Sequence, residues 1–395
     1  MKIELIATTK LGYKAEKEEF DNFGGKSAGI CYMAHDFSTL LSEPAEKTAR
    51  RIAQTKGSGH HSVYDHQYLS LYIEGLPKAL AMVLNNEKMY TTSEKSARYT
   101  KMVLTADEQK LYNKWLGIFE ELISDKYKAL RPEFFTDSKI KKLAQENARY
   151  LTSVFTPTSM EYTISYRQLN YLYKFLRDQQ ASEQKNKFME LLSPAIADFC
   201  TAIETSIPYL DSDLQRDGKN RKISLFRDPI LPAEKHFGTT YATNYKGSFA
   251  ELAQAQRHRT INYDITLLDT NEYYVPPILA ENPTLVEEWT KDIDSLSVNF
   301  PQGMLVNINE SGNLQDLILK AKERCCTFAQ KEINDQTHQT LVEYEQALRA
   351  KGTAEYDALA DYVQKYTKGS RCTFPDYTCL SRCGFPEGVT GEREI

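Results

Sequence analysis

The chain has 395 residues, of which 41% are hydrophobic and 26% are charged, so it can form two domains with packed cores. Its formal net charge is −5, which excludes proteins that bind nucleic acid through a strongly basic surface. It has no apolar run of roughly 18 residues, which excludes a membrane-spanning helix. Local basic clusters are therefore candidate sites for small anions.

Residues 1–9 alternate like a first β-strand and do not resemble a signal peptide, so we expect a cytoplasmic protein. The seven cysteines are an odd number, and Cys31, Cys200, Cys325 and Cys326 lie away from any disulfide-like spacing, so in a reducing compartment these four are expected to be free thiols. Gly24-Gly25 predicts a turn. The pattern then predicts helices over 36–56, 77–89, 106–151, 165–178 and 183–206, a strand over 68–73, and a polar loop over 93–99.

The second half repeats this order of elements in outline. Strands are predicted over 241–247, 262–266 and 304–308, and helices over 248–259, 283–294, 312–349 and 353–367. This predicts an internal duplication in an α+β protein, with a mixed or antiparallel sheet and long helices in each copy. The expected boundaries are a first repeat 1–206, a connector 207–222, a second repeat 223–368 and a cysteine-containing tail 369–395.

Arg257-His258-Arg259 ends the predicted helix 248–259 and offers donors suited to phosphate or carboxylate oxygens. The alternative is a basic helix end that complements the helix dipole.

His60, His61 and His66 follow a Gly-Ser-Gly turn and suggest metal binding or hydrogen bonds to a planar heterocycle, but no zinc ligand set is complete. Polar residues at the end of a turn are the alternative. The loop 93–99 combines Glu94, Ser96 and Arg98, a mixture that can bind a nucleotide or simply face solvent.

Three cysteines gather in the tail, at Cys372, Cys379 and Cys383, in a context rich in proline and glycine. They could bind structural zinc with a fourth ligand from elsewhere, although no Cys-x-x-Cys pair is present. Redox thiols or plain tail cysteines are the alternatives.

Together these motifs resemble the flavin-dependent thymidylate synthases, with the family's motifs divided between the halves. The first half has Gly59-His60-His61-Ser62 with Asp65-His66, the loop 93–99, Arg149, and Arg167 of a degenerate Asn-x-Arg motif. The second half has Gln254 with Arg257-His258-Arg259, Asn313, and a run from Arg324 through Ala329-Gln330 to Glu332-Ile333. The first half reads Asn86-Glu87-Lys88 where the family has Arg-His-Arg, and the second lacks the nucleotide loop.

The resemblance implies reductive methylation of dUMP to dTMP, with FAD as cofactor and NADPH and methylenetetrahydrofolate as co-substrates. It implies a pocket shared by the two repeats and a homodimer that replaces the family's tetramer. It assigns Arg324 a catalytic role beside the uracil carbonyl, where it also binds substrate. The implied flavin-binding residues are His60, Arg167, Arg257, His258, Arg259 and Asn313, and the implied dUMP-binding residues are Glu94, Ser96, Arg98, Arg149 and Gln254.

Two other functions stay open. The chain could be a nucleotide-binding or assembly protein that keeps the fold without catalysis, which the divided motifs favour. It could also be a related flavin enzyme that transfers another one-carbon group to a pyrimidine nucleotide.

Overall fold

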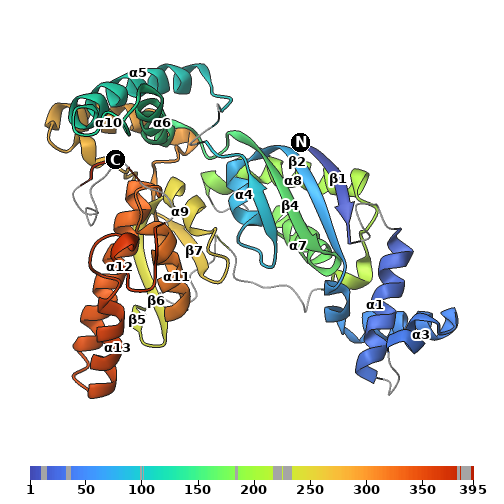
Figure 1. Ribbon diagram of the computed structural model, residues 1–395. Helices are drawn as coiled ribbons and strands as arrows, with labels where there is room; N and C mark the ends of the chain where they lie inside the picture. Colours follow the sequence, from blue (N-terminus) through green and yellow to red (C-terminus); the bar gives the residue numbers. More distant parts are fainter. Residues whose placement is uncertain are drawn as a thin grey trace. The chain divides into compact units, whose positions relative to one another are not determined.

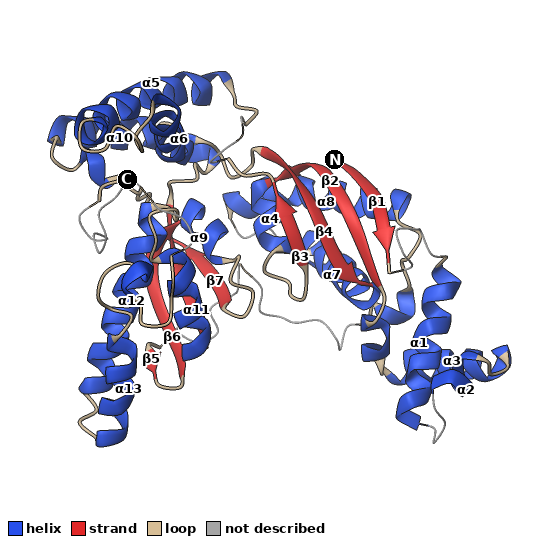
Figure 2. Ribbon diagram, in the orientation of Figure 1, coloured by secondary structure: helices blue, strands red, loops and turns tan. Residues whose placement is uncertain are grey.

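Two four-stranded antiparallel sheets form the framework of the protein, seen here in a computed structural model (Figure 2). The structure describes residues 1–9, 16–32, 37–97, 100, 102–182, 186–216, 225, 234–379, 383 and 393–395. The chain divides into two compact units: unit 1 comprises Met1–Lys95 and Pro157–Lys222, and unit 2 comprises Ser96–Thr156 and Ile223–Ile395. The predicted α+β class is confirmed.

The sheet of unit 1 has the order β1-β2-β4-β3, in which the fourth strand along the chain lies inside the sheet and the third at its edge. Its inner face is apolar because residues at every second position point the same way, and Leu69, Leu71 and Ile73 are each fully buried. The strands are β1 (Lys2–Thr8), β2 (Tyr68–Pro77), β3 (Thr91–Glu94) and β4 (Pro157–Ser165).

Helices of unit 1 cover this sheet and extend from its edge (Figure 1). The predicted turn at Gly24-Gly25 is wrong, because both glycines lie inside α1. A Cβ atom would lie 2.5 Å from the Tyr64 ring at Gly24 and 2.6 Å from Ile52 at Gly25, so glycine is needed for close packing rather than for a turn. The helices are α1 (Lys17–Tyr32), α2 (Phe37–Leu41), α3 (Ala45–Ser58), η1 (His61–Asp65), α4 (Lys78–Leu84), α7 (Tyr166–Ala181), α8 (Lys187–Ser206) and η4 (Ser212–Leu214).

The sheet of unit 2 has the order β5-β6-β8-β7, which is the strand order of unit 1. Its strands are β5 (His236–Phe237), β6 (Thr240–Ser248), β7 (Asn262–Leu267) and β8 (Leu305–Asn313). In both sheets a short helix follows the second strand and two long helices follow the fourth. The same order of strands and helices agrees with the predicted duplication, which itself stays a prediction.

Unit 2 contains a helical layer built from both halves of the sequence (Figure 1). Trp115 of α5 packs edge-to-face on Trp289 of α10, with ring centroids 4.9 Å apart. The helices of the unit are α5 (Ala106–Ile123), η2 (Ser124–Lys128), α6 (Asp137–Ala148), η3 (Arg149–Leu151), α9 (Phe249–Ala255), η6 (Pro277–Leu279), α10 (Pro283–Asp294), η7 (Ser297–Asn299), α11 (Leu314–Arg324), α12 (Lys331–Arg349), α13 (Ala354–Gln364) and η8 (Arg371–Thr373).

The compact units therefore do not follow the contiguous ranges 1–206 and 223–368. Residues 96–156 belong to unit 2 because the apolar faces of α5 and α6 are buried in one cluster with residues of α10. The boundaries of the two repeats in sequence stay a prediction, since packing says nothing about ancestry. Residues 217–222 of the predicted connector lie outside the described residues.

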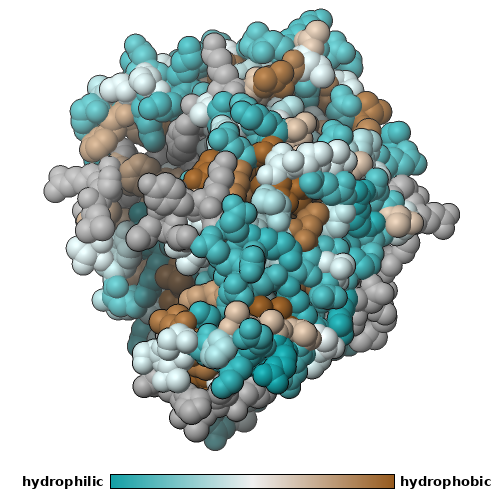
Figure 3. All heavy atoms as spheres, turned by 90° about the vertical axis from the view of Figure 1, so that its right-hand side faces the viewer, coloured by the Kyte–Doolittle hydropathy of each residue, from teal (hydrophilic) through white to brown (hydrophobic). Residues whose placement is uncertain are grey.

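The surface is mainly polar on the face drawn in Figure 3, where apolar side chains form small patches. Large exposed apolar side chains of the described residues include Ile30 and Leu130. In the described part of the chain, no helix is both long and apolar enough to cross a bilayer.

Candidate functional site

Arg324 ends α11 of unit 2, where neutral groups hold its side chain. Its Nε donates to Nε2 of His258 at 2.8 Å, and its Nη2 donates to the backbone carbonyl of Gln254 at 3.2 Å. The backbone carbonyl of Arg324 accepts from Asn334 Nδ2 at 2.9 Å. The end of α9 and the turn that follows it therefore fix the direction of the guanidinium.

His258 acts as an acceptor because it is held neutral. Burial, together with the adjacent Arg324 and the more distant Lys320, lowers the pKa of His258 to about 2. Since Nε2 accepts from Arg324, the ring proton of the neutral imidazole lies on Nδ1. The arrangement indicates that His258 orients Arg324, in addition to any contact with a cofactor.

Gln330 joins residues from both halves of the sequence in the interior of unit 2. Its side-chain oxygen accepts from Arg149 and from Gln254, and its amide donates to the hydroxyl of Tyr150. Gln330 is 3% exposed and Arg149 4% exposed. Arg149 and Gln254, which the resemblance assigns to the nucleotide, are therefore connected through a single amide.

Glu332 continues this network on the first turn of α12. It accepts from the backbone and hydroxyl of Ser248 at 2.8 and 2.6 Å and from the hydroxyl of Tyr150 at 2.8 Å. Burial raises the pKa of Glu332, although these hydrogen bonds oppose the shift. Burial also raises the pKa of Tyr150 well above its ordinary value, so the phenol stays protonated and donates.

Four of the predicted residues thus lie in one network of unit 2: Arg149, Gln254, His258 and Arg324. Ser248 and Tyr150 were not predicted. Tyr150 follows Arg149 directly, but the sequence pattern does not show that its hydroxyl meets α12. Three further predicted residues lie elsewhere in the unit: Arg257 is half-buried after α9, Arg259 is exposed, and Asn313 precedes α11.

Unit 1 contains a separate cavity of about 360 Å³ beside η1 and α7. Arg167 lines it and forms an ion pair of 2.6 Å with Asp65, which also accepts from Ser165 Oγ at 2.7 Å. The cavity is further lined by His61, Tyr68, Lys88, Met89, Gln168, Tyr171 and Leu214. Cationic, amide and aromatic side chains on one cavity of this size can hold part of a nucleotide.

The segment Asn86-Glu87-Lys88 reaches the same cavity. Glu87 is buried and accepts from the hydroxyl of Tyr171 at 2.9 Å, and its carbonyl accepts from Gln168 Nε2 at 2.7 Å. Lys88 lines the cavity. Where the resemblance expects Arg-His-Arg, the first half therefore has a buried carboxylate followed by the cation of Lys88.

The remaining predicted residues of the first half are not in this cavity lining. Glu94 forms a buried ion pair of 2.8 Å with Lys78, and the backbone N–H of half-buried His60 donates to Thr55 at 2.9 Å. Ser96 is assigned to unit 2, where its carbonyl accepts from the hydroxyl of Thr100 at 2.7 Å. Arg98 lies outside the described residues.

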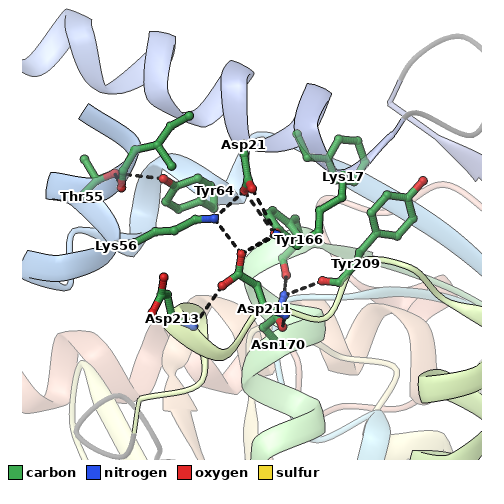
Figure 4. A network of polar contacts seen from close by, with 12 residues as sticks. Lys17, Asp21, Thr55, Lys56, Tyr64, Tyr166, Asn170, Tyr209, Asp211 and Asp213 are labelled. Carbon is green, nitrogen blue, oxygen red and sulfur yellow. Dashed lines mark hydrogen bonds and ion pairs between the residues drawn. The ribbon is translucent and has the colours of Figure 1, made fainter. Parts of the chain in front are cut away.

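A part-buried polar network, shown in Figure 4, holds η4, which contributes Leu214 to the lining of the unit 1 cavity. Asp211 accepts from Lys17 and from Lys56, both at 2.7 Å, and Lys56 also reaches Asp21 at 2.8 Å. The backbone N–H of Asp211 donates to Asn170 at 2.7 Å. These contacts join α1, α3 and α7 to η4, whose Leu214 lines the cavity. Two lysines balance two aspartates, which indicates a structural cluster.

Metal ligation finds no support among the described side chains, where no group of three or more His, Cys, Asp or Glu residues could hold an ion. Cys372 and Cys379 are exposed and Cys383 is half-buried. Zinc binding by the tail therefore stays an untested prediction.

The chain was compared with known protein families, sequences and structures. No curated protein sequence is significantly similar to the chain. A flavin-dependent thymidylate synthase ThyX from Helicobacter pylori, solved with FAD and dUMP, is 18% identical over 55% of this chain and 100% of its own, with a TM-score of 0.32. A UMP/dUMP methylase PolB from Streptomyces cacaoi, bound with 5-Br dUMP, is 15% identical over 54% of this chain and 92% of its own, with a TM-score of 0.34.

TM-scores this low do not establish a common site. The sequence match is more specific: residues 18–200 match the family model described as thymidylate synthase complementing protein. This segment contains the histidine motif, Glu94, Arg149 and Arg167. Residues 18–200, a little under half of the chain, are therefore similar to the thymidylate synthase complementing protein family.

Proposed function

We propose that the protein is a flavin-dependent thymidylate synthase, which converts dUMP to dTMP. In this reaction the hydrogen at uracil C5 is replaced by a methyl group whose carbon comes from methylenetetrahydrofolate, and NADPH supplies the two electrons. The observation that carries the proposal is the fixed guanidinium of Arg324, which His258 and Gln254 orient in the unit that also holds Arg149.

Arg324 suits stabilisation of negative charge on a uracil carbonyl. A donor that is already oriented before the reaction is worth roughly 3–4 kcal/mol in comparable oxyanion sites, because it needs no reorganisation. The imidazole of His258 and the backbone carbonyl of Gln254, both neutral, hold the guanidinium in place. Gln254 and Arg149 would hold the nucleotide, as the resemblance implies.

The unit 1 cavity fits part of a flavin dinucleotide. Arg167 and Lys88 offer cations for phosphate oxygens, His61 and Gln168 offer hydrogen bonds, and Tyr68 and Tyr171 offer faces for a ring. FAD, when bound, supplies the hydride chemistry that amino acid side chains lack. The resemblance also implies that His60, Arg257, His258, Arg259 and Asn313 bind flavin, and we propose these roles separately from this cavity.

A second candidate is a protein that keeps the fold without turnover. Two observations favour it: Arg149 is buried against Gln330, and Glu94 is paired with Lys78, so both groups already have protein partners. This candidate predicts a protein that lacks flavin, or that binds dUMP without converting it.

The experiment begins with the visible absorbance spectrum of the purified protein, before and after incubation with FAD. The protein is then assayed for dTMP with dUMP, methylenetetrahydrofolate and NADPH, and each component is omitted in turn. Flavin absorbance with dTMP formation that needs all three supports the synthase. Bound dUMP without product supports the second candidate, and another methylated or hydroxymethylated pyrimidine nucleotide would point to a related one-carbon transferase.

A further inference from the structure

Arg393 inserts into the interior of unit 2 although it lies far along the chain from the other residues of the network. It is 3% exposed, and its guanidinium donates to the carbonyls of Ala329 at 3.0 Å and of Cys326 and Thr327 at 3.4 Å. These carbonyls belong to the motif loop (Cys325–Gln330), which connects α11 to α12. One side chain therefore binds three carbonyls of the loop between Arg324 and Gln330.

The two residues that follow Arg393 are anchored on the helical layer. Ile395 is 4% exposed and belongs to the apolar cluster of α5, α6 and α10. Glu394 forms an ion pair with Lys126 of η2, and its backbone N–H donates to the hydroxyl of Tyr127 at 3.1 Å. We name Arg393–Ile395 the latch segment, because it joins the motif loop to helices from the first half of the sequence.

The fit of the latch segment is close. The cavity between Arg393, Ile395, Tyr150, Gln330 and their neighbours has a volume of only about 10 Å³, about the least that can hold one water molecule. A buried guanidinium is costly unless its donors are satisfied. Here loop carbonyls accept from both terminal nitrogens and the Ile395 carbonyl accepts from Nη1, whereas Nε has no hydrogen-bond partner among the described residues. The loop conformation and the buried cation therefore stabilise each other.

We infer that Arg393 is a positioning residue: the latch segment holds the motif loop in the conformation that places Arg324 and Gln330. Its effect on turnover rests on the proposed function, whereas its effect on the loop does not. Arg393 touches neither Arg324 nor the proposed substrate through these contacts, so it acts through the loop.

Thiol labelling of the full-length protein tests the inference without any activity assay. Cys326 is 6% exposed and its carbonyl accepts from Arg393, so loosening of the loop should expose its thiol. We expect Arg393→Gln to raise the labelling rate of Cys326 by about tenfold or more, and Arg393→Lys to have a smaller effect because it keeps the charge. Buried Cys200 of unit 1 is the internal control, and Arg349→Gln on exposed α12 surface is the matched variant.

A charge exchange provides a second test, which does not depend on the fold surviving loss of Arg393. Glu394→Lys and Lys126→Glu should each speed the labelling of Cys326, and the double variant should restore much of the protection. Unchanged Cys326 labelling in Arg393→Gln, or a double variant that labels as fast as its faster parent, would overturn the inference.

The kinetic test separates this inference from the proposed function. In Arg393→Gln we expect kcat for dTMP formation to fall about tenfold, with partial recovery on addition of guanidinium ion, which can occupy the emptied position. If Arg393→Gln speeds the labelling of Cys326 but the wild-type protein makes no dTMP, the inference about the latch segment stands and the proposed function is wrong. If Arg393→Gln leaves the labelling of Cys326 unchanged and the wild-type protein makes dTMP, the proposed function stands and the inference about the latch segment is wrong.

Discussion

At the scale of the residue, the contact between Arg324 and His258 links the second half's two most specific motifs. His258 lies after α9 and Arg324 ends α11, and their 2.8 Å hydrogen bond requires an unprotonated imidazole. The lowered pKa of His258 provides this state throughout the physiological range. The sequence identifies both residues through a resemblance, but it does not show that one orients the other.

Arg324→Ala is expected to lower dTMP formation by about two orders of magnitude, because the fixed cation is lost. His258→Ala should cause a smaller fall, mainly in kcat, since the cation remains but is no longer oriented. The measurement is steady-state turnover of dUMP, with exposed Arg349→Gln as control. Near-normal turnover of Arg324→Ala would remove this residue from the mechanism.

Asp211 gives a prediction for acid stability. Burial raises its pKa, but the hydrogen bonds from Lys17 and Lys56 outweigh this and lower the value from 3.8 to about 2. A carboxylate with a lowered pKa stabilises the fold above its unfolded value and loses that contribution as the pH falls from about 4 to about 2. The shift corresponds to roughly 2 kcal/mol.

We therefore expect Asp211→Asn to be less stable than the wild type at pH 7, with a difference that shrinks below about pH 4. Urea unfolding followed by a unit 1 signal, at several pH values, measures this. Exposed Asp213→Asn is the control. A stability difference that stays constant between pH 7 and pH 3 would contradict the assignment.

At the scale of the element, Glu108 connects the start of α5 to the chain beyond α6. It forms a capping box with Thr105 and also accepts from the backbone N–H of Ser153 at 2.8 Å. Thr105→Ala should cost about 1 kcal/mol, as for other helix caps. Glu108→Ala should cost more, about 2–4 kcal/mol, because two backbone donors lose a buried acceptor.

Thermal or urea unfolding monitored by tryptophan fluorescence measures these differences. Thr136→Ala, at the exposed cap of α6, is the matched variant, since its hydroxyl accepts only from Lys139 N–H at 3.3 Å. Equal costs for Glu108→Ala and Thr136→Ala would show that Glu108 has no role beyond an ordinary cap.

Local patterns predict much of the element inventory. The predicted helix 283–294 coincides with α10, and the predicted strands 262–266 and 241–247 lie within β7 and β6. The failure at Gly24-Gly25 has a physical cause, because a glycine pair signals a turn and a tight helix contact equally well. Local periodicity shows that α5 must bury a face, but it does not show that the face meets Trp289. The contact between Arg149 and Gln330 is likewise a long-range contact, which only the packing of residues 96–156 in unit 2 produces.

At the scale of the whole molecule, residues 96–156 of the first half of the sequence belong to unit 2. Both tryptophans of the chain, Trp115 and Trp289, therefore lie in one unit. Trp115→Ala, a change in the first half of the sequence, should lower the stability of unit 2 by about 3–5 kcal/mol, since both rings are fully buried. The unfolding transition reported by Trp289 fluorescence measures this, and Trp115→Phe should cost less. An unchanged transition in Trp115→Ala would contradict the division into units.

Oligomeric state belongs to the same scale. The predicted homodimer should scatter light as a particle with twice the mass of the 395-residue chain. A particle of single-chain mass at assay concentration would contradict the prediction.

The proposed function is a single reaction on dUMP, supported by the sequence match of residues 18–200 and by the oriented guanidinium of Arg324. The most direct test is the formation of dTMP by the purified full-length protein with FAD, dUMP, methylenetetrahydrofolate and NADPH. We expect one dTMP per NADPH oxidised and loss of product in Arg324→Ala. A flavin-loaded wild-type protein that binds dUMP and makes no methylated product would contradict the claim.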